Sequence, residues 1–193
     1  MDTQKELTPK ESLDMIREII TESRSRLEED GFIYIFWGIL IALASFGQYY
    51  LLTQGMYEVN YYPYFILPLG GVYTYFYYSR KENRPTNHIG KSISVLWIVL
   101  GLNMFALGFS YGMMLDTELV PVLLILLGIG IAVSGRLIQS TFLTGAGVVT
   151  NLLGLVCFFL PQMQHSLVMG IVAIVGVALP GFYLRNQHRK NHV

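Results

Sequence analysis

One long stretch of the chain carries very few charged residues. From Phe32 to Leu184 only nine residues are charged, and uncharged apolar segments separate them. Charged residues make up 13% of the sequence and hydrophobic residues 53%, whereas an ordinary soluble domain is roughly 25% charged. The pattern therefore favours a membrane protein. The nine charged positions are Glu58, Arg80, Lys81, Glu82, Arg84, Lys91, Asp116, Glu118 and Arg136.

Six segments approach the length of a membrane-spanning helix, which is about 20 apolar residues with a range of roughly 17 to 25. They cover residues 32–52, 62–78, 92–114, 119–134, 137–160 and 166–184. We therefore expect an all-α membrane protein with six transmembrane helices, arranged as three αα-hairpins. The second and fourth segments are short, and the topology changes if either of them lies in the membrane interface instead.

The positions of the basic residues test this count, because Lys and Arg are enriched on the cytoplasmic side of a membrane. With six spans and a cytoplasmic N-terminus, all 13 Lys and Arg residues fall on the cytoplasmic side. The other side carries only Glu58, Asp116 and Glu118. Both termini are therefore predicted to be cytoplasmic. The polar first thirty residues do not follow the pattern of a cleaved signal peptide, so we expect the spans themselves to anchor the chain.

The even-numbered spans end in similar sequences: "LPLGGVYTYFYYSRK", "LLGIGIAVSGRLIQ" and "VGVALPGFYLRNQHRK". Trp37 and Trp97 lie at similar depths in the first and third spans. Together these features predict a threefold hairpin repeat of roughly 50 to 60 residues.

Small residues spaced by four predict close helix packing in lipid, and Pro68 and Pro180 are expected to bend their spans. The small-residue pairs are Gly38 and Ala42, Gly70 and Thr74, Gly108 and Gly112, Gly130 and Ser134, and Thr150 and Gly154.

The spans lack the groups that membrane enzymes and coupled transporters use. No ionisable residue is expected in the hydrocarbon core, which counts against proton or sodium coupling. There is also no GxSxG, HExxH or P-loop sequence. We therefore expect no enzyme, no catalytic residue, no cofactor and no metal. His188 and His192 are four residues apart, as metal ligands on one helical face would be, but a solvated basic tail is the favoured interpretation.

Asn103 and Asn151 are the main polar residues near the middles of the third and fifth spans. If the repeat holds, they face each other or a common axis. They then either bind a polar ligand or make an interhelical hydrogen bond worth about 0.6 to 2 kcal/mol. We favour the hydrogen bond.

The first thirty residues contain one amphipathic helix. The sequence "TPKE" from Thr8 is a capping box with proline at the first helical position, so the helix should begin at Pro9. Its apolar stripe is the candidate partner-binding surface and consists of Leu13, Ile16, Ile20 and Leu27.

Three roles compete for this stripe. Residues 1–30 carry nine acids and five bases, which disfavours adsorption to acidic lipids. Packing on the basic cytoplasmic segments of the same chain is better supported, since opposite charges would meet. Pairing with a second copy or with a cytoplasmic protein is the third role, and the choice between the last two stays open.

The chain resembles a family of small, uncharacterised bacterial membrane proteins along nearly its whole length. The resemblance rests on "ESL" in the first helix, an aromatic run ending in "WG", "PLGG" in the second span, "LLGIGIAVSG" in the fourth and "LPGFYLR" at the end. It implies six spans, an N-terminal cytoplasmic helix and the bacterial cytoplasmic (inner) membrane, with no assigned activity.

We therefore predict three regions: a cytoplasmic amphipathic helix (1–30), a six-helix transmembrane bundle (31–185) and a basic cytoplasmic tail (186–193). The predicted function is non-enzymatic scaffolding or regulation through the N-terminal helix. The expected partners are the lipid bilayer and either a second copy of the chain or a cytoplasmic protein. We expect no nucleic-acid partner. The alternative is a carrier or small channel for a neutral or lipophilic molecule, which would use the bundle axis near Asn103 and Asn151.

Overall fold

The structure, a computed structural model, describes residues 9–29, 31–80, 88–109 and 118–191, and the side chains of residues 10–21, 31–80, 89–109 and 118–187. All secondary structure in the described part is helical. The elements are α1 (Pro9–Glu29), α2 (Gly31–Thr53), η1 (Tyr62–Phe65), α3 (Ile66–Arg80), α4 (His88–Phe109), α6 (Leu119–Leu137), α7 (Thr141–Cys157), α8 (Gln162–Val172), η3 (Ala173–Ala178) and α9 (Leu179–Asn191).

Four helices in the described part are long and apolar enough to cross a membrane. They are Gly31–Thr53, Ile89–Phe109, Leu119–Leu137 and the continuous run Gln162–Gln187. The segment predicted at 137–160 forms the shorter apolar helix Thr141–Cys157, and the segment predicted at 62–78 forms η1 followed by α3. These four candidate spans indicate a membrane protein. The predicted count of six spans is not confirmed.

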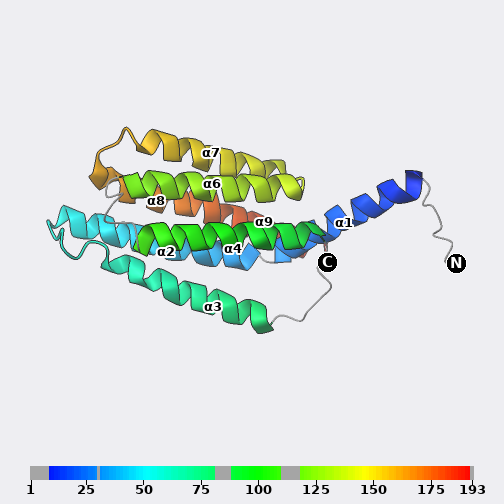
Figure 1. The fold of residues 1–193 in the computed structure, drawn as a ribbon, viewed down its shortest axis with the longest axis horizontal. Coiled ribbons are helices and arrows are strands. Elements are labelled where there is room, and N and C mark those ends of the chain that lie inside the picture. Colours follow the sequence, from blue (N-terminus) through cyan, green and yellow to red (C-terminus); the bar gives the residue numbers. More distant parts are fainter. Residues whose placement is uncertain (1–8, 30, 81–87, 110–117, 192–193) are drawn as a thin grey trace.

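The helices run side by side along the long axis of the bundle, and α1 projects from one end (Figure 1). The most extensive contact joins α6 to α7, and the next joins α2 to the continuous run of α8, η3 and α9. The pairs α2–α3 and α4–α6 touch less extensively. The predicted arrangement as three αα-hairpins is therefore not confirmed, because the largest interfaces join helices from different predicted hairpins.

Glycines explain why these two interfaces are the largest. A Cβ atom added to Gly147 of α7 would lie 2.2 Å from the backbone nitrogen of Ala132 in α6. A Cβ on Gly38 of α2 would lie 2.6 Å from the backbone nitrogen of Ala178. Without a hydrophobic driving force between helices in lipid, such backbone approach is a main source of association. In contrast, a Cβ on Gly108 of α4 would meet nothing within 4 Å.

Two clusters of buried residues fill the interior. One combines residues of α2, α4, α6, α7, η3 and α9, and the other combines residues of α6, α7 and α8. Many large apolar side chains are nevertheless exposed, including Leu43, Leu69, Leu102 and Phe159. Exposed apolar area on this scale would be a liability in water, and it is what a lipid-facing surface requires.

The two prolines sit at places where the regular helix changes. Pro180 follows the π-helix Ala173–Ala178 by two residues, and both features interrupt the α-helical hydrogen-bond ladder. Pro68 is the third residue of α3, where its missing N–H would have had no intrahelical partner. Pro68 therefore lies close to the change from the 3₁₀ helix η1 to the α-helix α3.

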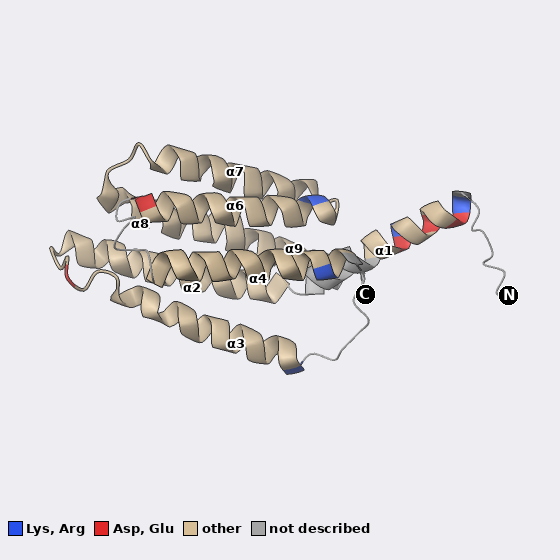
Figure 2. Ribbon diagram, viewed as in Figure 1, with Lys and Arg blue, Asp and Glu red and all other residues tan. Residues whose placement is uncertain are grey.

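Charge marks the two ends of the bundle (Figure 2). Arg80, Lys91 and Arg136 lie at one end, which we call the basic end. Glu58 and Glu118 lie at the opposite end. α1 leaves the bundle at the basic end (Figure 2).

Candidate functional site

The predicted N-terminal helix is present: α1 covers Pro9–Glu29, and Pro9 is the first residue that the structure describes. The capping interaction expected at Thr8 lies outside the described residues. The later part of α1 approaches the bundle, where the helix contacts α9, α4 and α2, and its first turns extend beyond the bundle (Figure 1). α1 is therefore anchored at one end and free of the bundle at the other.

The projecting part of α1 exposes two residues of the predicted partner-binding stripe. Leu13 is 58% exposed and Ile16 is 53% exposed, whereas Ile20, nearer the bundle, is half-buried. The side chain of Leu27 lies outside the described set. An apolar stripe that its own protein leaves uncovered is suited to contact with another surface.

Charged residues of both signs cover the rest of the projecting segment. Asp14 and Glu18 are exposed, and Arg17 lies 4.0 Å from the Asp14 carboxylate. This single surface pair contributes little stability. The projecting segment thus offers an apolar stripe beside a charged face, which suits a partner groove with an apolar floor.

The two asparagines predicted near the bundle axis have different neighbours. Asn151 donates from Nδ2 to the carbonyl oxygen of Ile125 at 3.2 Å, across the α6–α7 interface. Asn103 is exposed and donates from Nδ2 to the carbonyl oxygen of Val99, in its own helix, at 2.8 Å. The described contacts therefore do not join the two residues in a common polar site.

Two tryptophans make the same contact at two places in the bundle. Trp37 donates from Nε1 to Thr74 Oγ1 at 3.0 Å, and Trp97 donates from Nε1 to Ser134 Oγ at 3.1 Å. In both cases donor and acceptor are 37 residues apart. Each tryptophan ring also lies where a Cβ on a glycine of the facing helix would point, Gly70 for Trp37 and Gly130 for Trp97. The first two predicted hairpins thus share one local packing unit.

A polar cluster that sequence reasoning missed lies at the end opposite the basic end. Ser166 of α8 donates to Gln48 Oε1 of α2, and Gln48 donates from Nε2 to Asn60 Oδ1 at 2.8 Å. Nearby, the Ser45 and Tyr64 hydroxyl groups lie 3.1 Å apart. The sequence feature that could have indicated this cluster is that Gln48, Asn60 and Ser166 are polar and lie close to predicted span ends. These groups satisfy one another, so the cluster is a structural tie between α2, α8 and the loop after α2.

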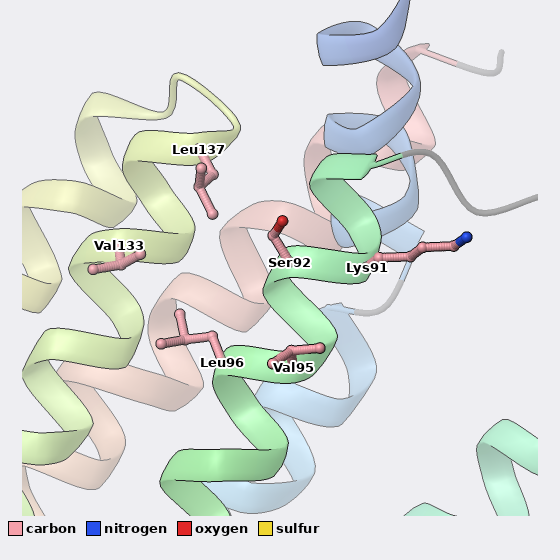
Figure 3. Close-up of a pocket in the computed structure, with 6 residues that line it drawn as sticks. All are labelled: Lys91, Ser92, Val95, Leu96, Val133 and Leu137. Atoms are coloured by element: carbon pink, nitrogen blue, oxygen red, sulfur yellow. The ribbon is translucent and has the colours of Figure 1, made fainter.

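A groove between α4 and α6 lies near the basic end (Figure 3). Its volume is about 530 Å³. Sequence reasoning did not predict it, because no local pattern indicates how far apart two helices diverge. Asn103 is not among its lining residues, which are Lys91, Ser92, Val95, Leu96, Val133 and Leu137.

Metal ligands do not gather in the described part of the chain, where no three His, Cys, Asp or Glu side chains come together. The side chains of His188 and His192 lie outside that part. The helix α9 itself continues to Asn191, so the region predicted as a tail from residue 186 is largely helical.

Comparisons of the chain with protein-family models, with curated proteins and with solved structures gave no match. The resemblance to a bacterial membrane-protein family therefore stays a prediction, and the site must be interpreted from its own residues.

Proposed function

We propose that this chain is a non-enzymatic, six-span protein of the bacterial cytoplasmic membrane that acts as a scaffold or regulator through α1. One observation carries the proposal: the apolar stripe at Leu13 and Ile16 projects from the bundle uncovered. A helix laid in a groove of a partner is recognised through such a stripe. The partner best suited to it is a cytoplasmic protein with an apolar groove that accepts one face of a helix.

The lengths of the shorter helices support six spans. At 1.5 Å per residue, the 17 residues of α7 extend about 26 Å, close to the roughly 30 Å of a bilayer core. The helix α3 is 15 residues long and is extended by the four residues of η1. Both run alongside the four longer helices (Figure 1). We infer that the basic end faces the cytoplasm, which puts α1 there too.

The matched tryptophan contacts support an internal repeat of the first two hairpins. The third hairpin has no tryptophan, since Trp37 and Trp97 are the only two in the chain. We therefore propose a twofold repeat with a unit of about 60 residues. The last spans were either added to this repeat or are a third unit that diverged further.

The test is crosslinking in native membranes followed by purification of the tagged chain. Ile16→Glu places a charge in the apolar stripe, and Thr21→Glu places the same charge on an exposed position of the polar face. We expect one protein to be recovered with the wild type and with Thr21→Glu, and lost both from Ile16→Glu and from a variant lacking residues 1–29. Recovery of the same protein with the truncated variant would contradict the proposal.

The carrier alternative would use a polar path near Asn103 and Asn151. Asn103 and Asn151 each donate one hydrogen bond, to Val99 and to Ile125, and neither of them lines the groove between α4 and α6. The observations on α1 therefore support the scaffold or regulator better.

A further inference from the structure

The groove between α4 and α6 changes from charged to apolar along its length. Lys91 and Ser92 line it near the start of α4, and Val95 and Leu96 line it one turn later. Val133 and Leu137 form the facing wall on α6. One helical turn is about 5.4 Å, so the change takes place over the depth of a membrane interface.

Positive charge at this end of the groove has no acidic counterpart among the side chains that the structure describes. Lys91 is exposed and forms no ion pair with any residue that the structure describes. Arg136, also exposed, belongs to the α6 turn between Val133 and Leu137. Among acidic side chains in the described part, Glu58 and Glu118 lie at the opposite end, and the others belong to α1.

The side chains that line the groove could contact both the head group and an acyl chain of a lipid. In Figure 3, Leu96 extends toward Val133, and the Lys91 ammonium group extends outward from α4, away from α6. The four-carbon stem of a lysine is flexible and commonly lies along apolar surface while its amine reaches the interface. Lys91 can therefore contribute its stem to the groove and its charge to a head group at the groove mouth.

We propose that this groove binds an anionic phospholipid. The phosphate lies at Lys91, near the basic end, and one acyl chain lies along Val95, Leu96 and Val133. Basic residues between membrane helices recognise acidic head groups in this way, each contributing on the order of 1 kcal/mol. A free phosphate ion would use the charge but leave the apolar wall unoccupied.

Native mass spectrometry of the full chain in detergent tests the site, with short-chain phosphatidylglycerol, phosphatidylcholine and inorganic phosphate as probes. We expect the wild type to bind phosphatidylglycerol at least about fivefold more tightly than phosphatidylcholine, and to show no saturable binding of phosphate. Lys91→Gln should remove this preference. Val133→Trp, at a partly exposed position, should weaken the binding of both lipids by filling the groove.

Arg80→Gln is the matched control, because Arg80 is exposed at the basic end but belongs to α3 and does not line the groove. It should bind both lipids as the wild type does. Equal affinity of the wild type for the two lipids would overturn the proposal, as would equal losses in Lys91→Gln and Arg80→Gln. Unchanged affinity in Val133→Trp would place the lipid elsewhere and would also overturn it.

Discussion

Gly147 shows how single residues set the architecture. A side chain there would overlap the backbone of Ala132, with its Cβ only 2.2 Å from a nitrogen atom. Gly128, Gly135 and Gly154 have the same relation to the facing helix. Since apolar side chains gain nothing from leaving lipid for a helix interface, contact between backbones supplies the attraction. The α6–α7 pair is thus specified by the absence of side chains along one face of each helix.

Gly147→Ala should lower the free energy of unfolding by about 1–3 kcal/mol, because the methyl group forces α6 and α7 apart. The measurement is the unfolding midpoint in detergent micelles. Gly145→Ala is the control, since a Cβ there meets nothing within 4 Å, and alanine favours a helix by roughly 0.5–1 kcal/mol. Equal destabilisation by both variants would show that the close approach is not what holds the pair together.

At the scale of elements, α1 differs from every helix of the bundle. It is the helix with the most charge, and it contacts the others only near its end. Isolated helices as short as the projecting half of α1 are marginally stable in water. The projecting half therefore depends on its own hydrogen bonds and on whatever covers Leu13 and Ile16.

Hydrogen exchange of the purified protein in detergent should show this difference. Amides of residues 10–20 should have protection factors at least about tenfold lower than those in the middle of α6, because few tertiary contacts oppose local opening. Equal protection in the two segments would mean that α1 is already covered in the isolated protein. Addition of the captured partner should then raise protection in α1 and leave α6 unchanged.

At the scale of the whole molecule, charge is separated between the two ends while the sides are apolar. Arg80 is exposed at the basic end and Glu58 at the other. This separation gives the bundle a preferred orientation in a membrane, since translocation of Lys and Arg is disfavoured.

Cysteine labelling in intact cells should reveal that orientation. The single native cysteine, Cys157, is buried and can be replaced by serine. In that background, Glu58→Cys should react with a membrane-impermeant maleimide from outside, and Arg80→Cys should react only after the membrane is opened. Arg80→Cys labelled from outside would place the basic end, and α1 with it, on the other face.

Several features of the fold could be predicted from local patterns. An N-terminal helix is present over Pro9–Glu29, and the first span predicted at 32–52 corresponds to Gly31–Thr53. Trp37 and Trp97, predicted to lie at similar depths, make matching contacts. These predictions succeeded because apolar length and periodicity act within one segment.

Helix partners could not be predicted in the same way. Gly38 and Gly108 are each followed by another small residue four positions later. Gly38 packs against Ala178, whereas Gly108 faces open space. The hydrogen bond from Ser166 to Gln48 joins residues 118 positions apart, and the separation of Asn103 from Asn151 depends on which helix each one faces. No local pattern carries that information.

By itself, the sequence determined that this chain enters a membrane and which end of its bundle is basic, because burial in lipid depends on residues close together in the chain. Tertiary structure alone decided that α6 pairs with α7 and α2 with α8, η3 and α9, that a groove opens beside Lys91, and that Leu13 and Ile16 stay uncovered. In a bilayer, almost any apolar helix face can be covered equally well by lipid or by another helix. The choice of neighbour therefore depends on how closely two whole surfaces fit.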